Sequence, residues 1–198
     1  MGGMESDEAK PWDNPLVVAD VAAWRAWLDE HEDETDGVWL VLAKKGRPAP
    51  TALNYDQALD EALCSGWIDG QVRGRDADTH LQRFTPRRRA SPWSVRNTGI
   101  VQRLADEGRM RARGQAEIDR AKSDGRWDRA YAGSATAEVP DDLTAALALG
   151  PAAAARFAEL KSSERFPILY GLMTAATPKT RASRIARAVE RLAGDGPK

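Results

Sequence analysis

Two kinds of hydrophobic pattern occupy different parts of this 198-residue chain, and their order limits the folds that it can adopt. Short apolar or alternating runs occur at 38–43, 67–72 and 80–85, and such runs are typical of β-strands. Beyond Pro86, apolar residues recur at helical spacing almost to the end of the chain. We therefore predict an α+β fold, in which a small, mainly antiparallel three-stranded sheet packs on helices and a helical C-terminal half follows.

The three strand patterns differ from one another. The run 38–43 is continuously apolar, which is typical of a strand covered on both faces. The runs 67–72 and 80–85 carry polar residues at alternate positions, so one face of the sheet is either an ordinary half-exposed face or part of a site. The residues Asp76-Ala77-Asp78 between them predict a hairpin with a connection longer than two residues.

Capping residues place the ends of the predicted helices. Asn54 and Gln57 form a capping-box pattern at the start of a helix over 55–65, which Gly66 ends. Ser91 and Pro92 are the predicted cap and first residue of a helix that stops before Gly108. Helical spacing with local caps predicts the other helices at 17–28, 115–122, 141–149, 152–161, 163–173 and 178–193, and Asp20 is the candidate cap of the first.

Composition shifts suggest three segments. Residues 1–15 are rich in charge and proline, which predicts a flexible N-terminal arm, with Trp12 as a residue that could dock on the body. Residues 16–133 form the predicted α+β core with its basic segment, and residues 140–196 form the helical C-terminal region. The loop 134–140 is the candidate boundary, although both parts could also form one continuous domain.

The content of cysteine and histidine excludes some kinds of site. One cysteine and two histidines cannot form an internal disulfide or a Cys/His zinc cluster, and no cofactor-binding motif occurs, so we expect neither a metal nor a cofactor. The N-terminus is acidic rather than signal-like, and no apolar run is long enough to span a bilayer, so we expect a cytoplasmic protein.

Charge is strongly segregated along the chain. Residues 1–72 hold 5 Lys and Arg against 15 Asp and Glu, whereas residues 73–129 hold 15 against 8. Five arginines with interleaved aromatic and hydroxyl side chains occur in 83–97. Either the basic region binds an anionic partner, with nucleic acid as one possibility, or the two regions neutralise each other within the chain.

No catalytic residue stands out, so the candidate site is a ligand-binding one. Forked guanidinium groups hold phosphate or carboxylate, and a helix N-terminus adds amide donors. Asp69 could pair with Arg83 on the neighbouring strand, and a carboxylate beside a pocket would also suit an enzyme. The predicted ligand-binding residues are Asp69, Arg83, Arg87, Arg88, Trp93, Ser94 and Asn97.

Other polar groups have simple structural interpretations. Cys64 lies near the end of its predicted helix, so we expect a buried, unreactive thiol. His31 sits in an acidic turn, and His80 has no nucleophile near it in the sequence. The last helix carries an arginine stripe that a solvated outer face explains without a ligand, at Arg181, Arg184, Arg187 and Arg191.

Several motifs resemble the bacterial YdeI/OmpD-associated family, also called bacteriocin-protection proteins, in one collinear order over residues 38–193. They are the runs at 62–70, 83–88, 91–97, 107–110, 121–127, 130–131 and 180–185. Arg111-Ala112 departs from the Thr-Pro-like pair expected after Gly108-Arg109-Met110. The resemblance implies a role in survival under antimicrobial peptides or bacteriocins and an envelope association, and it brings no catalytic residue.

Three hypotheses follow. The first is a non-enzymatic protein that protects against stress or bacteriocins through binding an anionic ligand or a protein partner. The second is a binder of nucleic acid or a phosphate ligand that uses segment 83–97. The third is an enzyme of unknown reaction with a pocket near Asp69.

Overall fold

The structure is a computed structural model that describes residues 10, 12–47 and 49–194. Contacts within the chain divide these residues into two compact units. Unit 1 comprises residues up to Ser91 together with Ile100–Arg120, and unit 2 comprises Pro92–Gly99 together with Ala121 onward. The predicted segment boundaries at 16–133 and 140–196 stay a prediction. Most of the arm 1–15 lies outside the described residues.

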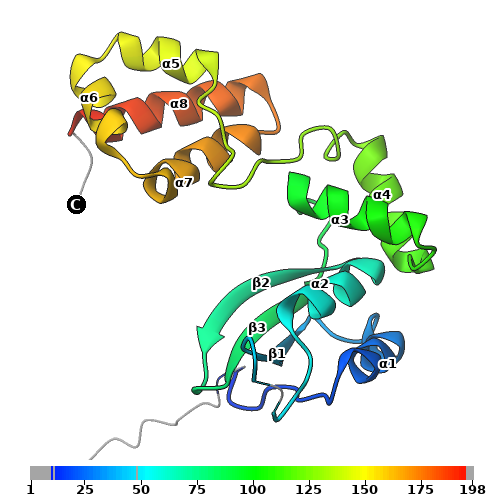
Figure 1. The fold of residues 1–198 in the computed structure, drawn as a ribbon. Helices are drawn as coiled ribbons and strands as arrows, with labels where there is room; N and C mark the ends of the chain where they lie inside the picture. The colour runs from blue at the N-terminus through cyan, green and yellow to red at the C-terminus, as the bar shows by residue number, and fades with distance from the viewer. Residues whose placement is uncertain (1–9, 11, 48, 195–198) are drawn as a thin grey trace, which may run out of the picture. The chain divides into compact units, whose positions relative to one another are not determined.

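The predicted fold class is confirmed. The elements run in the order α1 (Val21–His31), β1 (Val38–Ala43), α2 (Tyr55–Cys64), β2 (Trp67–Gly74), β3 (Thr79–Pro86), α3 (Val95–Asp106), α4 (Ala112–Ser123), α5 (Asp141–Ala148), α6 (Pro151–Glu159), α7 (Ser162–Met173) and α8 (Pro178–Ala193) (Figure 1). The strands form one antiparallel sheet in the order β1-β3-β2. Among the described residues, no helix combines the length and the apolar character needed to cross a membrane.

Both faces of β1 are covered, as its continuous apolar run predicts. On one face, Phe84 of β3 contacts Trp24 of α1, with ring centroids 5.7 Å apart. On the other, Trp39, Val41 and Leu81 form a small buried cluster. Trp12 packs edge-on against Trp39 at 6.0 Å, so the tryptophan of the predicted arm does dock on the sheet.

The start of α2 follows the predicted capping box closely. The Asn54 side chain accepts a hydrogen bond from the N–H of Gln57, and the Gln57 side chain accepts one from the N–H of Asn54. Gly66 ends the helix with φ +72°, a conformation that side-chain-bearing residues rarely adopt. The sequence pattern therefore fixes both ends of this helix locally.

Two predicted helix starts are wrong, and both errors have the same cause. Helix α1 begins at Val21 rather than Val17, because the backbone of Leu16 pairs with β1 as an isolated bridge, whereas the predicted cap, Asp20, is confirmed. Helix α3 begins at Val95 rather than Pro92, because the N–H of Tyr131 donates to the Trp93 carbonyl and the N–H of Val95 donates to the Tyr131 carbonyl. In each case, pairing with a distant segment keeps the chain extended past the expected start.

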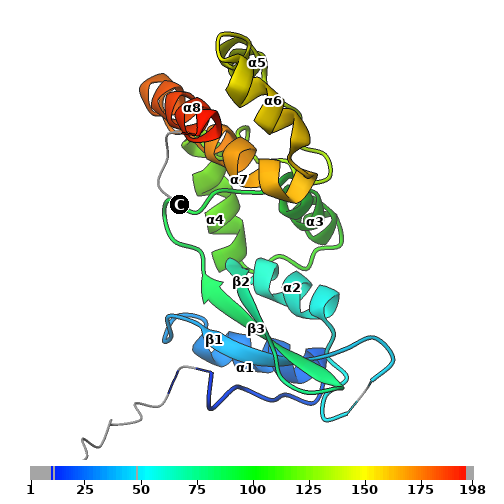
Figure 2. The same ribbon diagram turned by 90° about the vertical axis from the view of Figure 1, so that its left-hand side faces the viewer.

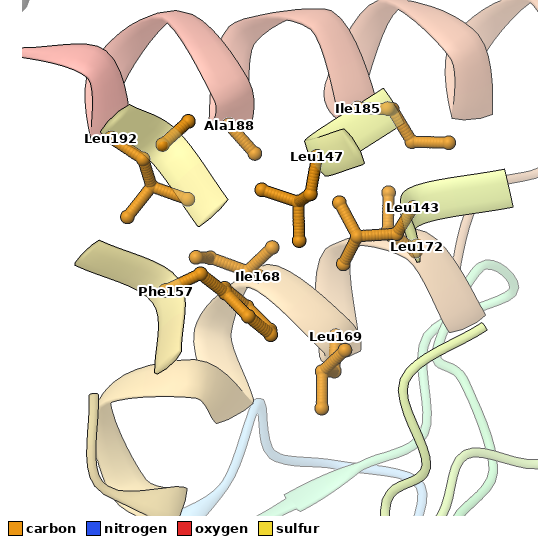
Figure 3. Packing of buried hydrophobic residues seen from close by; sticks show 10 residues of the cluster. Leu143, Leu147, Phe157, Ile168, Leu169, Leu172, Ile185, Ala188 and Leu192 are labelled. Atoms are coloured by element: carbon orange, nitrogen blue, oxygen red, sulfur yellow. The ribbon is translucent and has the colours of Figure 1, made fainter. Parts of the chain in front are cut away.

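Unit 2 has its own core, built by the four helices α5–α8 (Figures 2 and 3). The apolar stripe of α8 packs toward the other three helices, and Figure 3 shows Leu192, Ala188 and Ile185 along it. The other labelled core residues are Leu143, Leu147, Phe157, Ile168, Leu169 and Leu172. Arg184, Arg187 and Arg191 lie beside this stripe, along the side of α8 next to α7.

Candidate functional site

Four of the predicted ligand-binding residues lie in unit 1, and they do not form one cluster. The Asp69 carboxylate accepts a hydrogen bond from the Tyr55 hydroxyl at 2.9 Å. Arg83 reaches the backbone carbonyl of Asp36 at 3.4 Å, and burial lowers its pKa while Asp36 opposes that shift. Arg87 is buried, whereas Arg88 is exposed.

The expected ion pair between Asp69 and Arg83 does not form in the described structure. Asp69 lies opposite Phe84 in the register of β2 and β3, so the side chains of Asp69 and Phe84 share one face of the sheet. Arg83 precedes Phe84 and therefore projects from the other face. The prediction failed because the backbones of Asp69 and Arg83 lie close together on neighbouring strands, but their side chains project from opposite faces of the sheet.

The three remaining predicted residues lie in unit 2 and have structural roles. Trp93 is 1% exposed, and its ring packs against Trp127 with centroids 5.3 Å apart. The Ser94 hydroxyl accepts a hydrogen bond from the N–H of Asn97 at 3.1 Å, which caps the start of α3. Asn97 is itself buried. Whether any of the seven predicted residues binds a ligand stays a prediction.

Much of the basic middle third is neutralised by acids of the first third. The buried Glu61 carboxylate pairs with Arg109 at 2.7 Å and with Arg111 at 2.9 Å. Arg103 pairs with Asp60 at 2.7 Å. For Arg109, burial lowers the pKa, but hydrogen bonds to Glu61 and Glu107 outweigh it, so the pKa lies above its ordinary value. These arginines join α2 to the segment around α3 and α4, and they serve packing within unit 1.

The thiol of Cys64, the single cysteine, lies in this region and is unreactive. Cys64 is fully buried, and burial together with the neighbouring Glu61 raises its pKa to about 11. A thiol with so high a pKa is almost entirely protonated at neutral pH and is a poor nucleophile. Among the described residues, no group of three or more His, Cys, Asp or Glu side chains is placed to hold a metal ion.

The arginines of α8 have a different environment. A groove of about 360 Å³ lies between α7 and α8, and we call it the arginine groove. Arg184, Arg187 and Arg191 line it, and its described lining contains no carboxylate. By contrast Arg181, one turn earlier on α8, is held by Asp142 in a two-pronged ion pair with a shortest distance of 2.6 Å.

The floor of the arginine groove is apolar and continuous with the core. Ile168 of α7 and Ala188 of α8 belong to the buried cluster and also line the groove, and Figure 3 shows them between the two helices. Gly171 has no side chain, so the stem of Arg184 lies across α7, where its Nη1 donates hydrogen bonds to the Gly171 carbonyl and the Thr174 hydroxyl. Arg184 is therefore a fixed charge at the groove wall.

Comparison with known families divides the chain. Residues 16–117, just over half of the 198 residues, match the family model DUF8412, described as a domain of unknown function. The chain belongs to the DUF8412 family. Residues 136–194 match a second model, described as "Bacteriocin-protection, YdeI or OmpD-Associated". The comparisons with curated proteins and with solved structures found no match.

The resemblance to the YdeI/OmpD-associated family is thus confirmed for a shorter range than its motifs suggested. The motif at 180–185 lies inside the matching range 136–194. The motifs between 62 and 110 lie inside the DUF8412 match instead. The arginine groove lies entirely within the YdeI-like range, so it is the candidate site of that part of the chain.

From the sequence alone, the arginines of α8 are expected to form a solvated face. The pattern does not reveal that α7 supplies an apolar floor and a glycine beside them. A usable indication was present in the sequence, because Arg184, Arg187 and Arg191 recur at helical spacing.

Proposed function

We propose that this chain is a non-enzymatic, YdeI-like binding protein that holds an acidic segment of a protein partner in the arginine groove and protects the cell under stress through that binding. The observation that carries the proposal is the set of three arginines, Arg184, Arg187 and Arg191, around a groove whose described lining has no carboxylate. Guanidinium groups in such a place form charge-assisted hydrogen bonds with carboxylates.

The apolar floor favours a protein segment as the occupant. Protein interfaces combine an apolar centre with a polar rim, and arginine is enriched among the residues that dominate binding energy. Ile168 and Ala188 provide the apolar centre here, and the arginines provide the rim. A volume of about 360 Å³ accepts one or two side chains, so the expected ligand is a segment with an apolar anchor between acidic residues.

The binding test uses a fluorescent peptide in which glutamates flank a leucine. We expect the double variant Arg187→Glu/Arg191→Glu to weaken binding at least tenfold, because each lost charge-assisted contact accounts for about that factor. The variant Arg88→Glu/Arg89→Glu, which changes the net charge by the same amount in unit 1, is the matched control and should bind like the wild type. Equal loss in both variants would show that only overall charge matters.

The cellular test follows from the description of the YdeI-like family match. A strain that lacks the gene should become more susceptible to bacteriocins or antimicrobial peptides, and the wild-type gene should restore resistance. The Arg187→Glu/Arg191→Glu gene should fail to restore it despite normal protein levels. Unchanged susceptibility on deletion would remove the protective part of the proposal and leave the binding part to the peptide assay.

A second candidate function is binding of nucleic acid or a phosphate ligand by segment 83–97. It is favoured by Arg88 and Arg89, which are both exposed and make no side-chain ion pair with any described carboxylate. In this case a single-stranded oligonucleotide would bind with an affinity that falls steeply with salt. The variant Arg88→Glu/Arg89→Glu would lose that binding, and the α8 double variant would keep it.

A further inference from the structure

The loop between β1 and α2 forms one wall of a large open groove in unit 1, which we call the loop groove. Its volume is about 820 Å³, within the range of pockets that hold small molecules. Lys44, Lys45 and Arg47 line this wall. The first residues of α2 and His80 of β3 line the remainder.

A tight turn gathers the three cations. The N–H of Arg47 donates to the carbonyl of Lys44 at 3.0 Å, and Gly46 between them has φ +76°. The Lys44 ammonium donates to the carbonyl of Asp76 at 2.7 Å. Arg47 lies 3.4 Å from the Asp78 carboxylate, a pair in which both side chains are largely exposed. The turn is thus fixed to the β2–β3 hairpin, and its cations stay at the groove.

Lys45 is the cation of this turn that no described group engages. It is exposed, and the described structure gives its ammonium neither a hydrogen bond nor an ion pair. Asp56 supplies the one carboxylate in the described lining, against three cations. Even with Arg47 paired to Asp78, two lysines face one carboxylate in the described lining, so an excess of positive charge remains at the groove wall.

The opposite wall presents polar groups in fixed positions. Asn54 caps α2, so the positive end of that helix dipole lies at the groove. The Tyr55 hydroxyl donates to the Asp69 carboxylate at 2.9 Å, which holds its ring in place. Burial and the charge of Lys44 lower the pKa of His80, which favours the neutral imidazole with its one donor and one acceptor.

We propose that the loop groove is a second binding site of this protein, independent of the arginine groove, for a small phosphate-bearing molecule. Lysine ammonium groups act as point-charge partners of phosphate, and the turn here contains two consecutive lysines, Lys44 and Lys45. The volume exceeds that of a phosphate alone, so the ligand carries an organic group that lies along Asn54 and Tyr55.

The chain offers an internal reporter for this site, because it contains only two histidines. His80 lines the loop groove, whereas His31 stacks on Trp27 at 4.7 Å with its Nδ1 against the Trp27 carbonyl. NMR of the two imidazoles in the full chain is therefore the primary test. At constant ionic strength, pyrophosphate and ATP should shift the His80 signals in a saturable way and leave those of His31 in place.

Three outcomes of the NMR titration would overturn the proposal. They are no shift of His80, equal shifts of both histidines, and an equal response to adenosine and to ATP. The last would mean that the phosphates are not what the groove recognises.

Variants locate the binding to the turn. Lys45→Ala removes a side chain that makes no described contact, so the fold should not change, and ATP affinity should fall about tenfold. Lys179→Ala, which removes an exposed lysine of α8 in unit 2, is the matched control and should bind ATP like the wild type. Unaltered affinity in Lys45→Ala would overturn the site. The variant Arg187→Glu/Arg191→Glu should keep its ATP binding, which would show that ATP binds in the loop groove and not in the arginine groove.

Discussion

The two units use arginine in opposite ways. In unit 1, Arg109 and Arg111 meet the buried Glu61 at 2.7 and 2.9 Å, and the charges cancel inside the fold. In unit 2, Arg187 and Arg191 line a groove with no carboxylate in its described lining. Arginine thus stabilises the fold in unit 1 and is a candidate ligand-binding residue in unit 2. The difference depends on whether an acid from a distant part of the chain reaches it.

The contrast between the units accounts for part of the charge segregation seen in the sequence. The sequence allows the basic region 73–129 either to bind an anion or to face the acidic first third. For Arg103, Arg109 and Arg111, the second interpretation holds, since their partners include Asp60 and Glu61. Positive charge that no described carboxylate pairs lies on α8, on the β1–α2 turn and at the exposed Arg88 and Arg89.

The largest expected effect concerns Glu61. Glu61→Ala leaves two guanidinium groups without their shared carboxylate, which should cost about 3 kcal/mol of unit 1 stability. The single buried Cys64 reports this directly, because a thiol reagent reaches it only when unit 1 opens. Labelling should accelerate about a hundredfold. Arg191→Ala should leave the labelling rate unchanged. An equal acceleration in both variants would contradict the contrast between arginines that stabilise unit 1 and arginines that line the groove of unit 2.

A second prediction tests the packing that brings the unit 1 pairs together. A Cβ on Gly114 of α4 would overlap the carbonyl oxygen of Cys64 and lie 2.8 Å from its carbonyl carbon. Gly114→Ala should therefore destabilise unit 1 by about 2 kcal/mol, measured by urea unfolding.

Gly99 of α3 is the matched control for that substitution. A Cβ there meets nothing within 4 Å, so Gly99→Ala should stabilise the helix by up to about 1 kcal/mol. Destabilisation by both changes would mean that glycine flexibility, rather than close packing of α4 on α2, is what matters.

The third prediction concerns a substitution that adds a carboxylate to the arginine groove, so that its arginines are paired as those of unit 1 are. A Cβ at Gly171 would lie 4.0 Å from Cδ of Arg184, so a side chain fits there. Gly171→Glu places a carboxylate beside Arg184 and should weaken binding of the acidic peptide about tenfold. Gly171→Ala should bind within about twofold of the wild type. Equal binding by the glutamate and alanine variants would argue against charge recognition in the groove.

The smallest expected effect concerns the neutralised arginine of α8. The hydrogen bond from Arg181 lowers the pKa of Asp142, so this pair stabilises unit 2 fully above about pH 4 and loses that effect as the pH falls through the lowered pKa. Because both side chains are partly exposed, Asp142→Asn should cost about 0.5 kcal/mol at about pH 7. The difference from the wild type should shrink as the pH falls below the ordinary pKa of an aspartate, whereas Arg191→Ala should show no such dependence.

Prediction from sequence succeeded where local pattern suffices. The bounds of β1, the capping box of α2 and the antiparallel arrangement of three strands all follow from spacing and capping. It failed where a distant segment intervenes, as at the starts of α1 and α3. The predicted grouping of the candidate residues also failed, because Asp69 and Arg83 project from opposite faces of the sheet and Trp93 is buried in the core.

Residue order alone was sufficient for the fold class, the succession of sheet and helices, and the segregation of acidic from basic residues. These properties are local or compositional, because periodicity, caps and counts depend on neighbours along the chain. Which arginines are neutralised depends instead on the folded arrangement. Glu61 lies 48 residues before Arg109, and Asp142 lies 39 before Arg181. The Coulomb energy of a pair depends on distance in space and on burial, and neither can be obtained from separation in sequence.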